Sequence, residues 1–128
     1  MKVPMDLPGA DLVSRGLRDL EREVESIAAL LVAIGAPRLR ALGFDVAGAA
    51  RLRGEPELLL YRRLARRSGR AAHSEYNALV RQLVSFERAA ECRESRRRVR
   101  SSRLERSVRA GEVSRFRPQR VAKRSGRA

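Results

Sequence analysis

The 128-residue chain contains no tryptophan and only one cysteine and one histidine. A lone Cys92 excludes an internal disulfide and favours a reducing, cytoplasmic setting. With His73 nineteen residues away, the two side chains form no zinc-ligand set. We find no glycine-rich phosphate loop, nucleophile elbow or paired-acid arrangement. The sequence therefore predicts no cofactor and no metal, and it leans away from an enzyme without excluding one.

Long apolar stretches are also missing. The longest apolar run covers residues 27–34, well short of the ~18–20 residues that span a bilayer. The N-terminus lacks the basic and apolar regions of a signal peptide. A basic helix lying on a lipid surface would need an opposite apolar face, which residues 93–109 lack. We expect no membrane partner.

What is abundant is positive charge, with 29 Lys and Arg residues against 15 Asp and Glu residues. Residues 91–128 hold fourteen of the basic residues and four acids, a net charge of +10 out of the total +14. All but Lys2 and Lys123 are arginine. Arginine grips phosphate with a planar fork of donors, although a GC-rich genome would also favour arginine codons. The asymmetry predicts a polyanionic partner.

The chain is organised around one long helix predicted from Ser74 to about Arg109. Ser74 is placed as its N-cap and Gly111 as its stop. Its first half repeats apolar residues at three- and four-residue spacing, which is typical of a helix on a core. Its second half is crowded with arginine. At ~1.5 Å per residue the helix would be roughly 54 Å long, more than a small domain can cover.

Shorter helices precede it. One is predicted from about Gly9, with a stripe comprising Leu12, Val13, Leu17, Leu20 and Val24. Ser26 is expected to cap a wholly apolar helix over residues 27–34 that forms the centre of the core. Pro37 opens a further turn, and Phe44 and Val46 are expected to pin the next loop to the core. Residues 47–54 are ambiguous, because glycines oppose the helix that alanines favour. Pro56 and Glu57 predict the start of another helix, which ends at Ser68 and Gly69.

The predicted fold class is all-α, a bundle of four to five helices with a long C-terminal arginine-rich helix. The chain divides into an irregular lead-in (1–8), a helical bundle (9–92), an arginine-rich helical extension (93–110) and a basic disordered tail (111–128). The tail is predicted to be disordered because it cannot bury enough apolar surface to offset its chain entropy.

The helicity of the extension is finely balanced. Glu94 with Arg98, and Glu105 with Arg109, are favourable pairs four residues apart. Repulsive arginine pairs such as Arg96 and Arg100 oppose them. We therefore predict partial helicity in the free protein and full helicity when a polyanion neutralises the arginines.

The sequence favours non-catalytic binding of RNA or DNA through phosphate contacts, with little reading of bases. Phe116 is the only aromatic residue of the basic region, so a stacking platform has little support there. The alternative is an interaction subunit docking on an acidic or helical protein, and the oligomeric state is left open. The predicted nucleic-acid-binding residues are Arg93, Arg96, Arg97, Arg98, Arg100, Arg103, Arg106, Arg109, Arg115, Arg117, Arg120, Lys123 and Arg124.

Two further patterns carry weaker hypotheses. Residues 64–79 loosely resemble a helix-turn-helix, in which Ser74, Asn77 and Arg81 would face the groove. Arg70 and Glu75 depart from that pattern, so an ordinary helical hairpin turn is favoured. His73 follows Arg66 and Arg67 at a spacing loosely similar to that of HEPN-type ribonucleases, but arginines lie near most positions of this chain.

A third pattern is the acidic run of residues 19–25. As a metal site it is disfavoured, because alternate positions do not converge on one helix face.

Overall fold

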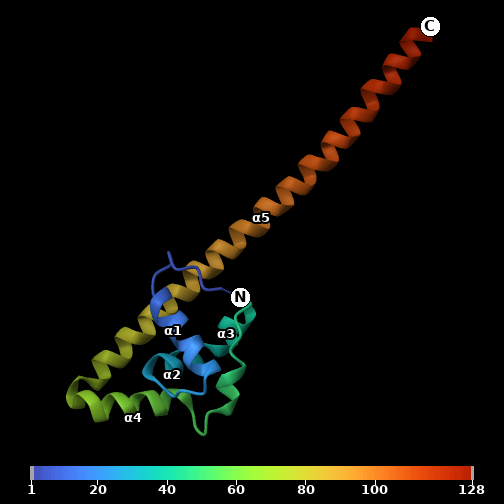
Figure 1. The fold of residues 1–128 in the computed structure, drawn as a ribbon. Coiled ribbons are helices and arrows are strands. Elements are labelled where there is room, and N and C mark those ends of the chain that lie inside the picture. Colours follow the sequence, from blue (N-terminus) through green and yellow to red (C-terminus); the bar gives the residue numbers. More distant parts are fainter. Residues whose placement is uncertain (1, 128) are drawn as a thin grey trace. The chain divides into compact units, whose positions relative to one another are not determined.

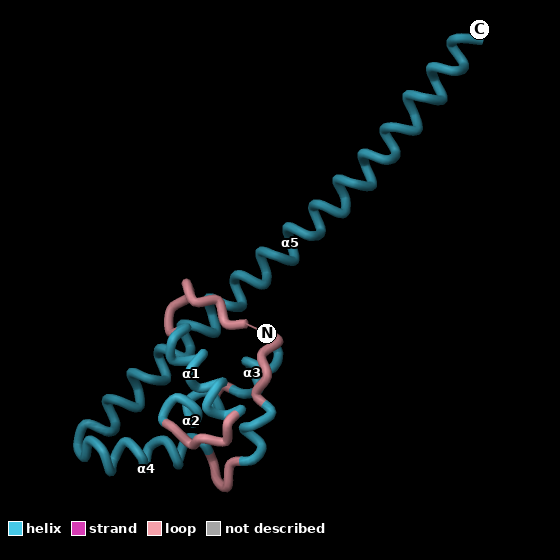
Figure 2. Tube along the Cα trace, in the orientation of Figure 1, coloured by secondary structure: helices cyan, strands magenta, loops and turns pink. Residues whose placement is uncertain are grey.

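The computed structural model describes residues 2–127, with side chains as far as Val108. Every regular element of this part is helical, which confirms the all-α prediction. The elements are α1 (Ala10–Glu21), α2 (Ile27–Ile34), α3 (Ala36–Ala41), η1 (Ala47–Arg51), α4 (Pro56–Ser68), η2 (Gly69–Ala71) and α5 (Ala72–Arg127). Figure 1 shows their arrangement and Figure 2 the loops that join them. The chain divides into two compact units, Met1–Cys92 and Arg93–Ala128, and α5 contributes to both.

Helix α1 confirms most of the stripe predicted for it. Val13 and Leu20 are buried, and Leu12 and Leu17 pack against the core. Val24 does not belong to the stripe, because α1 ends at Glu21 and Val24 is 49% exposed. Glu23 adopts a positive φ of 60°, so the chain leaves the helical path before it reaches Val24.

Helix α2 is the centre of the core, as its uniformly apolar sequence predicts. The Ser26 side chain accepts a hydrogen bond from the amide of Ala29 at 3.1 Å, so Ser26 is the N-cap. The residues from Ala28 to Ala33 are all buried. Gly35 ends the helix, and Pro37 lies in the first turn of α3.

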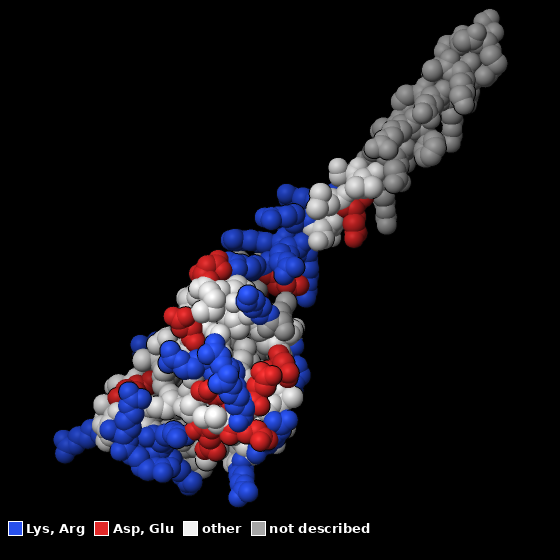
Figure 3. Space-filling view, viewed as in Figure 1, with Lys and Arg blue, Asp and Glu red and all other residues white. Residues whose placement is uncertain are grey.

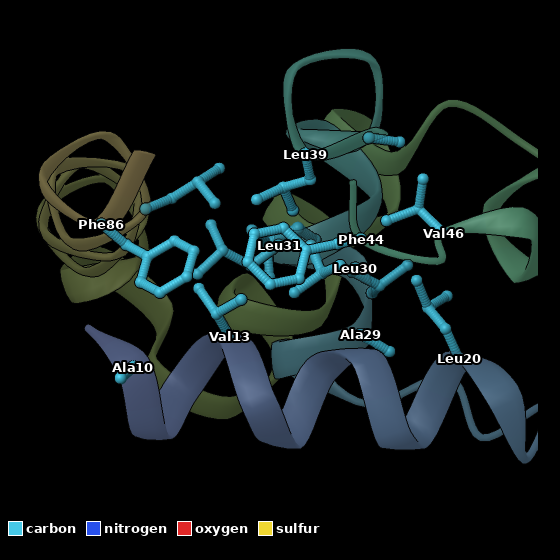
Figure 4. Packing of buried hydrophobic residues seen from close by; sticks show 14 of the residues in the cluster. Ala10, Val13, Leu20, Ala29, Leu30, Leu31, Leu39, Phe44, Val46 and Phe86 are labelled. Carbon is cyan, nitrogen blue, oxygen red and sulfur yellow. The ribbon is translucent and has the colours of Figure 1, made fainter. Parts of the chain in front are cut away.

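Gly16 lies where α1 packs closely on the backbone of α2. A Cβ atom built at Gly16 would lie 2.3 Å from the carbonyl oxygen of Ala28 and 2.4 Å from Val32 Cγ2. Only a residue without a side chain fits at this crossing. The two backbones can therefore pack closely, which brings Val13 onto the apolar surface of α2 (Figure 4).

The first part of α5 supplies the remaining wall of the core. Leu83, Phe86 and Ala90 are buried, which confirms the predicted apolar face. Phe86 meets Phe44 with ring centroids 5.8 Å apart, and Phe44 fastens its loop to the core as predicted (Figure 4). Val46 is buried as well, at 1% exposure.

The start of α5 differs from the prediction. Pro56 and Glu57 open α4 as predicted, and Gly69 ends it. The short η2 turn then takes up the change of direction, so α5 begins at Ala72. Ser74 therefore lies inside the first turn and is not the N-cap.

The backbone of α5 is helical as far as Arg127, so Gly111 does not end it. A glycine inside a helix costs only about 1 kcal/mol relative to alanine, which is too little to impose an end by itself. The disorder predicted for residues 111–128 is not confirmed. No helix of the described residues is long and apolar enough to cross a membrane.

Candidate nucleic-acid interface

The arginines of residues 93–108 are unevenly distributed around α5. Arg96, Arg100 and Arg103 follow one another at spacings of four and three residues, so they share one face of the helix. Arg93 and Arg97 flank this face, since each lies three or four residues from one of its members. Glu94 and Glu105, eleven residues apart, lie close to one line on the opposite side. We call Arg96, Arg100 and Arg103 the arginine face.

Few of these cations have an internal partner. Glu94 accepts contacts from Arg97 at 4.0 Å and from Arg98 at 3.7 Å, which confirms the predicted pair of Glu94 with Arg98. Both arginine side chains are at least 67% exposed, so the pairs are screened by water and neutralise their charges only weakly.

The arginine face has no carboxylate partner among the described side chains. Within the described side chains, Arg96, Arg100, Arg103 and Arg106 form no ion pair, and all four are exposed. Arg93 is half-buried and is not counted with them. Figure 3 shows the basic side chains of this stretch crowded together with few acidic ones between them. The side chains of Arg109, Arg115, Arg117, Arg120, Lys123 and Arg124 lie outside the described part.

Apolar side chains are also exposed on this stretch. Val99, Leu104 and Val108 are 52%, 62% and 59% exposed. Leu104 and Val108 share a face, whereas Val99 lies on the far side. Leu104 and Val108 are therefore an isolated pair of exposed apolar side chains and do not form a continuous stripe.

A second charged cluster, which sequence spacing did not reveal, lies in the first unit. Arg38 on α3 donates from Nε to Glu91 Oε1 at 2.5 Å and from Nη2 to Glu91 Oε2 at 2.8 Å. Its Nη1 lies 3.6 Å from Oε1 of Glu87, whose side chain is only 5% exposed. The partners are 53 residues apart, too far for any local pattern to connect them.

The pKa values of the two carboxyl groups in this cluster are shifted in opposite directions. Burial, more than the nearby Glu91 charge, raises the pKa of Glu87, while Arg38 opposes the rise. The hydrogen bonds from Arg38 lower the pKa of Glu91. This arrangement braces α3 against α5 and commits the Arg38 guanidinium to two acids of the same unit. We interpret it as structural.

The residues considered for catalysis or metal binding do not come together in one site within the described part of the chain. His73 is exposed, and its Nε2 lies 3.3 Å from Nδ2 of Asn77, which therefore already has a partner. Cys92 is exposed. The described residues contain no group of three or more side chains that could hold a metal ion.

Two of the acids in the 19–25 run have partners of their own. Asp19 accepts a hydrogen bond from Ser26 at 2.6 Å, and Glu23 pairs with Arg51 at 3.3 Å.

A hollow of about 460 Å³ lies beside α1 and η1. Its charged lining is mixed, with Lys2, Arg18 and Arg51 against Glu21 and Asp45. Arg51 is already paired with Glu23. The hollow therefore presents no concentrated charge of one sign.

No protein-family model matches the chain, and neither the curated proteins nor the solved structures give a match.

Proposed function

We propose that this protein is a non-catalytic, basic nucleic-acid-binding protein that contacts mainly phosphates through its C-terminal arginine-rich segment. The observation that supports the proposal most directly is the exposed arginine face, whose three guanidinium groups have no carboxylate partner among the described side chains. Unpaired arginines on a helix can each give a bidentate contact to phosphate. The proposed binding residues are those predicted from the sequence, from Arg93 to Arg124.

The energetic basis is the release of counterions. Each phosphate neutralised by arginine frees condensed cations from the nucleic acid, which favours binding at low salt. Such contacts fix position but carry no base sequence. The proposal therefore predicts binding to RNA and DNA of many sequences, with affinity falling linearly against salt on logarithmic axes. A cytoplasmic location remains a prediction.

The test is fluorescence anisotropy with a labelled DNA duplex of mixed sequence over a series of salt concentrations. The triple variant R96Q/R100Q/R103Q should bind much more weakly than the wild type. It should also reduce the steepness of the salt dependence by about 2 to 3, because each lost phosphate contact removes ~0.9 from the slope.

The matched control is R22Q/R40Q/R53Q, which removes the same charge from three exposed arginines that are scattered over the first unit. It should retain nearly the wild-type slope. If the two triple variants lose equal affinity, only total charge matters. That result would contradict a specific role for the arginine face in binding. Failure of the wild type to bind any duplex or RNA at low salt would overturn the proposed function.

A simpler observation precedes this experiment. The chain has no tryptophan and two tyrosines, so the pure protein absorbs ultraviolet light weakly. Nucleic acid that co-purifies would dominate the spectrum and should disappear after a wash at high salt.

The alternative function is a helical interaction subunit that docks on an acidic or helical protein. Leu104 and Val108, exposed on one face of α5, support it. The apolar residues of 76–92 do not, because Leu83, Phe86 and Ala90 are buried within the first unit. Under this alternative L104S/V108S would abolish partner binding and leave nucleic-acid binding unchanged.

A further inference from the structure

The only two tyrosines of the chain pack against each other. Tyr61 on α4 and Tyr76 on α5 have ring centroids 6.0 Å apart, with an interplanar angle of 60°. This edge-to-face contact is a favourable aromatic geometry. Tyr76 is half-buried, whereas Tyr61 is 41% exposed. Tyr76 therefore supports the Tyr61 ring from within the fold, and part of that ring remains open to solvent.

On the outer face of α4, arginines adjoin the apolar surface around the open ring. Leu58 and Ala65 are exposed and lie three and four residues from Tyr61, so they continue the apolar surface around it. Arg62 lies on the other side of these two residues, four from Leu58 and three from Ala65. Arg66 follows Arg62 by four residues and so extends this surface away from Tyr61. We call Leu58, Tyr61, Arg62, Ala65 and Arg66 the tyrosine–arginine patch.

No ion pair among the described side chains compensates the charge of this surface. Residues 58–70 contain five arginines and no acid. Within the described side chains, none of these arginines forms an ion pair. The nearest acid on α4 is Glu57, one turn before Tyr61 on the side away from Arg62 and Arg66. Glu57 acts on the Tyr76 hydroxyl, whose pKa is raised by burial first and by this charge second.

An exposed aromatic ring beside unpaired arginines matches the chemistry of a nucleic-acid single strand. A free base can stack on the ring while the adjoining phosphates contact the cations. In a duplex the base faces are already stacked and cannot reach a protein ring. An acidic peptide would use the arginines but would leave the ring without a specific partner.

We propose that the tyrosine–arginine patch binds single-stranded RNA or DNA, with one base stacked on Tyr61 and flanking phosphates held by Arg62 and Arg66. This inference rests on the proposed function only in that the ligand is a nucleic acid. It adds a second surface, remote in sequence from residues 93–128. It also adds a preference for single strands that the arginine face does not require.

Intrinsic fluorescence tests the patch directly, because the chain has no tryptophan and both tyrosines belong to this contact. Titration of the full chain with a short oligothymidylate should quench the tyrosine emission as a base stacks. A duplex bound to equal occupancy should leave the emission nearly unchanged. N-acetyltyrosinamide, titrated in parallel, corrects for light absorbed by the nucleic acid.

Two pairs of variants separate stacking from charge. Y61L should weaken binding of the single strand roughly tenfold, within the range measured for the loss of one stacked base, and should leave duplex binding unchanged. Y61F keeps the ring and should bind like the wild type. R62Q/R66Q should reduce the salt slope for the single strand by about 1 to 1.5, while R63Q/R67Q, its matched control on the far side of α4, should have a smaller effect.

The outcomes distinguish this inference from the proposed function. If the wild type binds nucleic acid but Y61L and Y61F bind single strands equally well, the patch is not a stacking site and this inference fails alone. Equal quenching by single strand and duplex would also overturn it. Tyrosine emission that changes with protein concentration and not with nucleic acid would assign the patch to a second copy of the chain. Unchanged thermal unfolding of Y61L would show that a lost affinity does not come from misfolding.

Discussion

Arg38 and Glu91 form a bidentate, hydrogen-bonded ion pair that joins the short helix α3 to α5. Nε and Nη2 of Arg38 meet the two carboxylate oxygens of Glu91 at 2.5 and 2.8 Å. The same guanidinium lies 3.6 Å from the buried carboxyl of Glu87. Arg38 is therefore the common partner of two acids that lie one turn apart on α5.

This shared role predicts unequal effects on stability. R38Q should lower the urea midpoint of unfolding more than E91Q does, because loss of Arg38 leaves Glu87 buried without its cation. E91Q leaves the contact between Arg38 and Glu87 in place. The double variant R38Q/E91Q should lose less than the sum of the two single effects, since both report on one interaction.

The matched control for this series is R40Q, which removes an exposed arginine from the same helix α3. Its midpoint should equal that of the wild type. If R38Q and R40Q unfold alike, the pair contributes nothing measurable to the fold.

The buried Glu87 predicts a dependence of stability on pH. Its pKa is raised, chiefly by burial, so the folded protein retains a proton that the unfolded chain has already lost. Stability from this group is present below the ordinary pKa of glutamate and is lost as pH rises through the raised folded pKa. Glu91 acts in the opposite direction, because its lowered pKa stabilises the fold above the ordinary value.

Comparison of the wild type with E87Q isolates the buried group, because Glu91 is present in both proteins. Between about pH 4 and pH 7 the urea midpoint of E87Q should rise relative to that of the wild type. Unfolding curves measured in parallel at each pH provide the check. A difference that does not vary with pH would mean that Glu87 titrates alike in the folded and unfolded states.

The close packing at Gly16 predicts that G16A, which adds only one methyl group, lowers the free energy of unfolding. Alanine favours helix over glycine by about 1 kcal/mol, so G16A would be stabilising if propensity alone decided. The added Cβ would instead lie 2.3 Å from a carbonyl oxygen of α2 and force the two helices apart. We expect a net loss of about 1–3 kcal/mol in the free energy of unfolding, as is typical of overpacked cores.

G54A is the matched control for this substitution. A Cβ at Gly54 would meet only Leu59 atoms at 3.6 Å or more, which is ordinary van der Waals contact. This variant should be neutral or slightly more stable than the wild type. Chemical denaturation of both variants checks the pair, and an unchanged G16A would show that α1 and α2 are not held in close contact there.

Sequence alone determined the features that depend on neighbouring residues. Ser26 caps α2 and Pro56 opens α4, because a cap or a helical first turn is a property of three or four consecutive positions. The apolar face of residues 76–90 was visible from its spacing, and the C-terminal excess of arginine was visible from counting. The predicted binding residues remain predictions. An excess of arginine indicates a polyanionic partner but does not show which residues contact it.

Only the tertiary structure decided which distant residues meet. Arg38 reaches Glu91 across 53 positions, Tyr61 packs on Tyr76 across the turn between α4 and α5, and Gly16 contacts the α2 backbone. These contacts follow from the angles at which packed helices cross, which depend on the summed shape of the core and not on any local pattern. Sequence spacing therefore placed the arginines on helices. The packing of Tyr76 on Tyr61 depends instead on the tertiary fold, because α5 must turn back on α4 to bring the two rings together.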